Sequence, residues 1–507
     1  MAGLIPLACV ACVLLLVYWV SGAAYNLFLH PLRRYPGPRH WAATRLFLTA
    51  STLRGRAVHE INAMHRRYGH VVRIAPDQLS YTDERAWRDI CGVTRAAPLG
   101  MRKDDRLNDL VGGHATNPDP SKHKADMQHT RMRRALAPAF TMASLRQQVP
   151  LVMRHVDELV ALLMTAAREG RPVDMGRLYT FTLYDIFSDL FLGESFHLLS
   201  DAALHQWASS MVGFAKATTA LAALSHFPLA RLVIRLLLKF AGAKSRDAFM
   251  NPCFDRFERR AAQGSKGGTT GGRCDVVHFV LESRNSKQQV TEKELRDFSP
   301  FLMIGGGETM ASLMPCLTYL LLKHPDVYQR LTSEIRGADF ASDATADLTV
   351  EGILRLPYLG ACIDEALRMY PPVPHGNERV VPAGGASVCG DRLPEGTIVV
   401  VSQLSTYRQK RNWFRPDSFL PEMWLPGAAT EFAQDCHASF KPFLVGPQGC
   451  VGQELANLTM RLILSKLLLN FDLELEPESD MAWQADLPVY NVWIKPPLRV
   501  QLTRCRG

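Results

Sequence analysis

One cysteine in a glycine-rich loop, followed at once by an amphipathic helical pattern, constrains this chain more than any other feature. The segment reads SFKPFLVGPQGCVGQELANLTMRLILSKLLLNF, residues 439–471, and holds Cys450 among Gly446, Gly449 and Gly452. After the loop, apolar residues recur at helical spacing. Cys450 therefore has four interpretations: a buried structural residue, a nucleophile, a redox sensor or a metal ligand.

The residues around Cys450 favour the metal ligand. A nucleophile needs a base, and the position of the nearest histidine, His437, cannot be derived from sequence alone. Glycines allow positive φ and a close approach of the backbone to a bulky, flat group. A helix that begins near Val451 directs free N–H groups and the positive end of its dipole at the sulfur, which stabilises a thiolate. With Phe443 upstream, the pattern is typical of an axial thiolate ligand to haem iron.

Helical periodicity dominates the rest of the chain. Segments 145–170, 204–227 and 455–471 repeat apolar residues at helical spacing, whereas 69–83 and 385–403 alternate as strands do. A composition of 47% hydrophobic and 21% charged residues fits a folded, core-forming protein. We therefore expect one mainly α catalytic body with a small β portion.

The N-terminus predicts a membrane anchor. Residues 4–20 form an apolar run without charge, near the lower length limit for spanning a bilayer. A cleaved signal peptide is the alternative, but no basic residue precedes the run. Arg33 and Arg34 follow it, which places the body on the cytosolic side. The expected division is a membrane anchor over 1–24, a proline-rich tether over 25–40 and a catalytic domain over 41–507, with a flexible glycine-rich loop over 261–275.

The charge and the cysteine content exclude several classes of function. The net charge of +9 is spread without a long basic run, which argues against nucleic-acid binding and favours an acidic partner or an anionic membrane surface. The eleven cysteines are scattered, and the one C-x-x-C pair, Cys9 and Cys12, lies in the apolar N-terminal run. A disulfide framework or a zinc site is therefore not expected.

The cysteine loop resembles a known haem-binding signature. Phe443-x-x-Gly446-x-Gln448-x-Cys450-x-Gly452 is similar to the haem-binding loop of the cytochrome P-450 superfamily, the haem-thiolate monooxygenases. The resemblance covers nearly the whole chain and implies the superfamily fold, with haem between a long central helix and the cysteine loop. It implies haem b (iron protoporphyrin IX) as cofactor, with Cys450 as the axial iron ligand and the other four signature residues around the haem.

A second segment matches the central helix of that family. IGGGETMASL, residues 304–313, resembles the oxygen-activation segment, in which Glu308 and Thr309 match the catalytic acid–alcohol pair that relays protons. The glycines at 305–307 are expected to loosen the helical hydrogen bonds and to make room for dioxygen.

The same helix has a clear start and two interruptions. Thr291-x-x-Glu294 predicts a capping box. Pro300 and Pro315 lie inside the pattern, and each costs roughly 3 kcal/mol in a regular helix, so kinks are expected there.

A third motif implies a structural ion pair. Glu365-x-x-Arg368 matches the family's E-x-x-R, whose two side chains share one helical face. The segment FRPDSFLPEMWLP, residues 414–426, resembles the family's partner segment but has Met423 where an arginine is usual. The three-way network is expected to be lost or rebuilt by another arginine, and the candidates are Arg408, Arg411 and Arg415.

The residues that would bind the haem propionates are also altered. Gln448 stands where the family usually has Arg or His, and its amide N–H lacks charge assistance. The resemblance assigns Arg379 to the propionates. It also assigns them His129 and Arg133, which lie one helical turn apart on one face; a solvated basic face is the alternative for these two.

The implied activity is a monooxygenase that inserts one oxygen atom from O₂ into an apolar small molecule. The chain has no FMN- or NAD-binding fingerprint, so electrons would come from an NADPH-cytochrome reductase, with cytochrome b5 as an alternative donor. The implied location is the endoplasmic reticulum membrane. Lys441, Arg461 and Lys466 are candidate reductase contacts. Segments 25–38 and 69–83 are similar in style to filamentous-fungal members that modify terpenoids, polyketides or alkaloids.

Two other functions stay open. One is a haem-thiolate isomerase or dehydratase that does not use O₂, and the other is a degenerate membrane-anchored binding protein. A cysteine hydrolase would need a histidine beside Cys450 and would bind no haem. By family position, the substrate pocket would be lined by residues 100–125, 180–220, 303–306 and 373–376 and by the surroundings of Val489.

Overall fold

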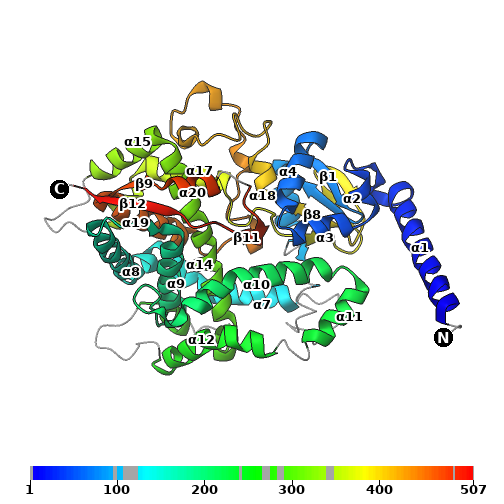
Figure 1. The fold of residues 1–507 in the computed structure, drawn as a ribbon, viewed down its shortest axis with the longest axis horizontal. Helices are drawn as coiled ribbons and strands as arrows, with labels where there is room; N and C mark the ends of the chain where they lie inside the picture. The colour runs from blue at the N-terminus through cyan, green and yellow to red at the C-terminus, as the bar shows by residue number, and fades with distance from the viewer. Residues whose placement is uncertain are drawn as a thin grey trace.

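Helices predominate in the computed structural model of this chain, as the periodicity predicts (Figure 1). The structure describes residues 4–94, 97, 100–104, 106, 124–238, 243–264, 274–282, 290–338, 348–483 and 486–505. The α-helices are α1 (Leu4–Phe28), α2 (Arg39–Ala43), α3 (Leu46–Leu53), α4 (Ala57–Tyr68), α5 (Glu84–Ala86), α7 (Lys124–Leu136), α8 (Met142–Arg168), α9 (Met175–Leu192), α10 (His205–Leu224), α11 (Pro228–Leu237), α12 (Ala243–Ala262), α13 (Val276–Glu282), α14 (Glu292–Lys323), α15 (Pro325–Arg336), α16 (Val350–Leu354), α17 (Pro357–Met369), α18 (Gln403–Tyr407), α19 (Gln453–Asn470) and α20 (Pro477–Trp483).

The strands form small sheets beside the helical body. They are β1 (Val71–Ala75), β2 (Gln78–Tyr81), β3 (Arg102–Lys103), β4 (Val173–Asp174), β5 (Arg379–Val380), β6 (Ala386–Val388), β7 (Asp391–Leu393), β8 (Ile398–Val401), β9 (Phe471–Leu475), β10 (Val489–Tyr490), β11 (Val492–Trp493) and β12 (Arg499–Arg504). The largest sheet has the order β1-β2-β8-β5-β3, and its β2–β8 pair is parallel. Both segments predicted as strands, 69–83 and 385–403, supply strands to the structure.

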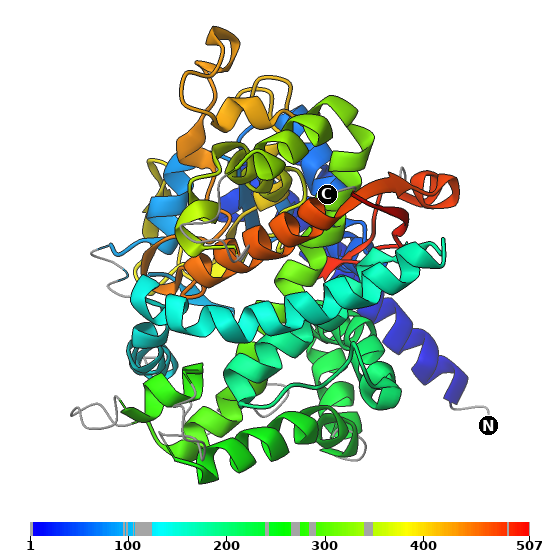
Figure 2. The same cartoon turned by 90° about the vertical axis from the view of Figure 1, so that its left-hand side faces the viewer.

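Helix α14 is the central element of the helical body. It begins at a capping box formed by Thr291 and Glu294, as predicted, and packs along α9. Helices α8 and α19 cross the same region of the molecule (Figure 2). Apolar side chains from these four helices belong to one large buried cluster, so the interior is built around α14.

The N-terminal helix extends further than the sequence indicated. Helix α1 ends at Phe28, four residues into the segment predicted as a tether, and it projects from the body with the N-terminus at its far end (Figure 1). The Arg73 guanidinium donates to the backbone oxygen of Asn26 at 2.9 Å, which fastens the end of α1 to β1. Among the helices of the described residues, none combines the length and apolar character that a membrane crossing requires.

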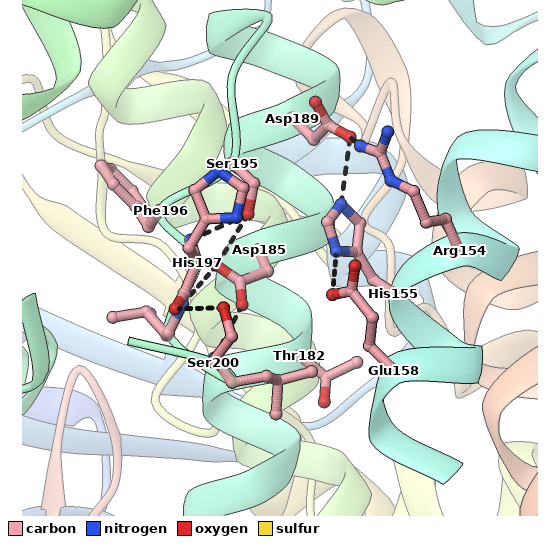
Figure 3. A network of polar contacts seen from close by, with 12 residues as sticks. Arg154, His155, Glu158, Thr182, Asp185, Asp189, Ser195, Phe196, His197 and Ser200 are labelled. Atoms are coloured by element: carbon pink, nitrogen blue, oxygen red, sulfur yellow. Dashed lines mark hydrogen bonds and ion pairs between the residues drawn. The ribbon is translucent and has the colours of Figure 1, made fainter. Parts of the chain in front are cut away.

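A buried polar network joins α8 to α9 (Figure 3). The two ring nitrogens of His155 lie 3.0 Å from a carboxylate oxygen of Asp189 and 3.1 Å from one of Glu158. Arg154 also donates to Asp189. These carboxylates raise the pKa of His155 above its ordinary value, although burial opposes the shift. The network therefore ties a buried histidine of α8 to a buried carboxylate of α9.

Two predicted segments fall mainly outside the described residues. Residues 265–273 of the predicted glycine-rich loop over 261–275 are not described. The same holds for 107–123, the larger part of the 100–125 segment assigned to the substrate pocket.

Candidate active site

The cysteine loop is held against a short π-helical turn, Trp87–Cys91. The Trp87 indole N–H donates to the backbone oxygen of Ser439 at 2.9 Å, at the start of the loop segment. Gly446 has φ +77°, and a Cβ atom there would lie 2.3 Å from the backbone oxygen of Cys91. This position therefore needs glycine for two reasons, a left-handed backbone and a close contact with another backbone.

The other two glycines of the loop have ordinary backbone angles. Gly449 has φ −60° and Gly452 has φ −92°, so the expectation of positive φ is wrong at both. A Cβ atom on Gly452 would meet the Phe140 ring at 3.7 Å, which is normal contact. Gly446 is therefore the loop position at which close packing against another stretch of backbone requires glycine.

Cys450 lies three residues before the start of α19, and the residue is exposed. Its backbone N–H donates to the oxygen of Phe443 at 2.8 Å, which closes the loop. Protein atoms around the loop partly shield the sulfur from water and raise the pKa of the Cys450 thiol, while the Gly452 N–H and the charge of Arg133 lower it. The Gly452 N–H and Arg133 are thus the groups of this loop region that favour the thiolate form of Cys450.

The predicted propionate residues gather beside this loop. Arg379 on β5 is 1% exposed and donates to the Met101 oxygen at 3.3 Å and to the side-chain oxygen of Gln448. Arg133 on α7 donates to the backbone oxygen of Gly449. The structure therefore brings Arg379, Gln448 and Arg133 onto the cysteine loop.

His129 and Phe443 have less defined roles. His129 lies one turn before Arg133 on α7 and is half-buried. Phe443 is half-buried and packs against the large apolar cluster, so it anchors the loop to the core.

The glycines of α14 serve helix packing. A Cβ atom on Gly306 would lie 2.6 Å from the Phe187 ring, and one on Gly307 would lie 2.9 Å from the Tyr184 ring. These two glycines let α9 approach α14, which stays helical through 305–307. Gly305 differs, because it is exposed in the middle of the core helix and no atom lies within 4 Å of a Cβ built on it.

Glu308 and Thr309 point to different neighbours. The Thr309 hydroxyl donates to the oxygen of Gly305 at 2.8 Å, on the side of the helix that stays open. The Glu308 carboxylate accepts a hydrogen bond from the buried Tyr184 hydroxyl at 2.5 Å. The acid and the alcohol are neighbours in sequence but bind different groups. Thr309 bonds to the helix turn at the exposed Gly305, and Glu308 bonds to Tyr184 on α9.

Helix α14 runs without a break through both of its prolines. Pro300 has no N–H, so the oxygen of Arg296 lacks its helical donor. The Ser299 hydroxyl donates to that oxygen at 2.9 Å. A side chain thus replaces the missing hydrogen bond, and the helix continues.

The E-x-x-R pair is confirmed as a buried ion pair. Arg368 donates to both carboxylate oxygens of Glu365, at 2.8 and 2.7 Å, and both side chains are fully buried. The Glu365 carboxylate also accepts from the Trp424 indole N–H at 3.0 Å and from the Leu420 backbone at 2.8 Å. Trp424 therefore supplies the donor that an arginine at position 423 would otherwise bring, and Met423 itself is buried in an apolar cluster.

The first of the three arginines named as candidates to rebuild this network has another role. Arg408 donates to the backbone oxygen of Met369 at 2.9 Å. In the described part of the chain, neither it nor the other two candidates, Arg411 and Arg415, is recorded as hydrogen-bonded to Glu365. The neighbouring indole donor has no counterpart in the motif and could not be assigned from sequence.

Sequence reasoning also missed a polar cluster at the edge of the β portion. Ligand atoms of Asp104, His226 and Glu378 lie within 4.8 Å of one another. Arg106 forms a salt bridge with Asp104 at 2.5 Å and donates to His226 Nδ1 at 3.1 Å. The Arg106 guanidinium thus contacts two of the three residues, and the cluster joins separate segments of the chain.

Comparison with known proteins identifies the family. The model of the family described as Cytochrome P450 matches residues 35–503. Averantin hydroxylase of Dothistroma septosporum is 37% identical over 96% of this chain and 90% of its own length. Cytochrome P450 monooxygenase tpeC of Talaromyces stipitatus is 36% identical over 98% of this chain and 94% of its own. Cytochrome P450 monooxygenase FUM2 of Gibberella moniliformis is 36% identical over 95% of this chain and 100% of its own.

These relatives and the family match cover both the helical body and the cysteine loop. They imply a haem-iron cofactor, O₂ and a small-molecule substrate. The residues present fit such a group, because the exposed Cys450 lies in the loop just before α19, the exposed Gly305 lies on α14, and these two helices are in contact with each other. The chain belongs to the cytochrome P450 family and is one of its oxygen-incorporating monooxygenases.

Proposed function

We propose that the protein uses haem b, with the Cys450 thiolate as axial ligand, to insert one oxygen atom from O₂ into an apolar fungal secondary metabolite. The observation that carries this proposal is the exposed Cys450 thiol in a loop fastened by Gly446, Trp87 and Arg133. When bound, the haem supplies the activation of dioxygen, and the second oxygen atom leaves as water. A terpenoid, polyketide or alkaloid is the proposed substrate class.

The proposal assigns a task to each predicted residue. Arg379 and Gln448 form one hydrogen-bonded unit, so Arg379 would meet one propionate with its full charge while Gln448 orients it. Arg133 and His129 would serve the other propionate, and Arg133 also holds the loop. On α14, Thr309 would pass a proton at its hydroxyl and Glu308 would accept and return it at its carboxylate.

Glu365 and Arg368 remain structural, because both are fully buried and bound to each other. A buried pair of this kind costs about 3–5 kcal/mol when one partner is removed. Their task is to hold α17 against the segment that carries Trp424.

We also propose attachment to the endoplasmic reticulum membrane through residues 1–24, followed by the tether over 25–40 and the catalytic domain over 41–507. The support is the apolar run of the sequence and its exposed side chains on α1, which include Leu14, Val17 and Tyr18. A lipid surface would cover side chains that water otherwise surrounds.

An NADPH-cytochrome reductase is the proposed electron donor, with cytochrome b5 as an alternative. Of the three candidate contacts, Lys466 pairs with Asp157 at 3.0 Å and Arg461 donates to the Leu356 oxygen at 3.2 Å. Both cations are therefore engaged within the chain, which leaves Lys441 as the candidate contact on this face.

The reduced, carbon-monoxide-bound absorption spectrum of solubilised membranes that contain the chain tests the proposal. A strongly red-shifted Soret band is expected for a thiolate-ligated haem. A band at the position of histidine-ligated haem, or no haem in folded protein, would overturn the ligand assignment and favour a degenerate binding protein. Product formation without NADPH would instead favour the isomerase or dehydratase.

A further inference from the structure

The second proline of α14 leaves a carbonyl group that a distant lysine binds. Pro315 has no N–H, so the oxygen of Ala311 lacks its regular helical donor. Lys495, in the C-terminal segment after β11, donates from Nζ to this oxygen at 3.1 Å and reaches the Ser312 hydroxyl at 3.4 Å. A lysine far along the chain thus completes the central helix.

This ammonium lies beside the face of α14 that carries Glu308. Residues 308 and 311 are three apart, so they share one face of the helix. Burial lowers the pKa of Lys495, and the negative charge of Glu308 opposes that shift. The thiol of Cys316 is the other titratable group that acts on Lys495.

Glu308 has a second partner on the opposite helix. The Tyr184 hydroxyl donates to its carboxylate at 2.5 Å, and the Tyr184 side chain is fully buried. Because the ring packs directly on the backbone at Gly307, this hydroxyl has little freedom to move. The phenol therefore holds this carboxylate from α9, and the ammonium binds α14 at Ala311, three residues further along.

We propose that Tyr184 and Lys495 are positioning residues that hold the Glu308 carboxylate in orientation for proton exchange with Thr309. The proposal rests on the proposed function of the Glu308–Thr309 pair. Tyr184 fixes the carboxylate by a hydrogen bond, and Lys495 acts through its charge. Pro315 contributes because it leaves the Ala311 carbonyl without a backbone donor. That carbonyl then binds the Lys495 ammonium three residues after Glu308.

A set of substitutions separates two roles of Lys495: the positioning of Glu308 and the binding of the carbonyl oxygen that Pro315 leaves without a helical donor. Lys495→Met removes the charge and the donor but keeps the length of the side chain, and Lys495→Arg keeps both. Pro315→Ala restores a backbone N–H for the Ala311 oxygen, so it makes the lysine unnecessary for the helix. Tyr184→Phe removes the hydroxyl and keeps the ring that packs on Gly307.

Oxygen reduction in the reconstituted system with NADPH and reductase, without organic substrate, is the readout. One NADPH and one proton reduce O₂ to hydrogen peroxide, whereas two NADPH and two protons reduce it to two waters. We expect Lys495→Met and Tyr184→Phe to slow water formation roughly tenfold or more and to move peroxide release toward one per NADPH. Lys495→Arg is expected to stay close to the unsubstituted chain.

Thermal unfolding of the same proteins gives the second readout. Lys495→Met is expected to lower the Tm, and the double variant with Pro315→Ala to regain it while still releasing excess peroxide. A double variant that regains both the Tm and the original peroxide ratio would show that Lys495 only replaces the missing hydrogen bond of the helix, and would overturn the proposal. A ratio of one peroxide per NADPH in the unsubstituted chain would overturn it too. Absence of the red-shifted carbon-monoxide band in the unsubstituted chain would instead remove the proposed function itself.

Discussion

Replacing Gly446 by alanine tests how the cysteine loop is held. Gly446 has φ +77°, where an L side chain costs about 1–2 kcal/mol. The added Cβ would lie 2.3 Å from the backbone oxygen of Cys91, and no flexible side chain can move to relieve that contact. Overpacking of this kind costs about 1–3 kcal/mol. The free energy of unfolding is therefore expected to fall by about 3 kcal/mol.

Gly452→Ala is the matched control in the same loop. Gly452 has φ −92°, and its new Cβ would make a normal 3.7 Å contact with the Phe140 ring, so stability should hardly change. An unfolding entropy of about 2.1 cal/mol/K per residue makes 3 kcal/mol equal to about 3 °C in Tm. Thermal unfolding of the haem-loaded proteins measures the difference, and their carbon-monoxide spectra report whether haem stays bound. Equal Tm values for the two variants would refute the packing argument.

Three further substitutions test separate parts of the structure. Cys450→Ser is expected to abolish the red-shifted Soret band of the reduced carbon-monoxide complex, and persistence of that band would mean that another residue binds the iron. Trp424→Phe removes an indole donor from the buried Glu365 carboxylate, so denaturant unfolding should show a loss of about 1–3 kcal/mol, whereas an unchanged midpoint would mean that the indole bond adds nothing. His155 has a raised pKa beside Asp189, so its contribution to stability is complete below the unfolded-state pKa of about 6.5 and is lost as pH rises through the folded-state value. His155→Gln should flatten that part of the profile of unfolding midpoint against pH, and an equally steep profile would assign the effect to other groups (Figure 3).

Local patterns in the sequence predicted the parts of the fold that depend on near neighbours. The capping box of Thr291 and Glu294 needs only three residues of helix, and it is present. The pairing of Glu365 with Arg368 follows from helical spacing, and it too is present. Alternation over 69–83 predicted strands, which are β1 and β2. In each case the interacting groups lie close along the chain, so composition and spacing suffice.

The family signature likewise identified which residues gather at the site, since Arg379, Gln448 and Arg133 all reach the cysteine loop. It could not assign their partners. Gln448 accepts from Arg379, a contact between residues 69 positions apart, and Arg133 holds the loop backbone itself. These bonds depend on how β5 and α7 pack, which no short motif encodes.

Sequence alone therefore determined the helical class, the start of the central helix, the cysteine loop and the E-x-x-R pair. Tertiary structure decided what the glycines and prolines do: Gly306 admits the Phe187 ring, and Lys495 binds the oxygen that Pro315 leaves without a donor. It also decided that Trp424 completes the Glu365 network. The physical reason is the same in each case, because a close approach or a missing hydrogen bond is satisfied by whichever side chain the packing brings near, however distant it is along the chain.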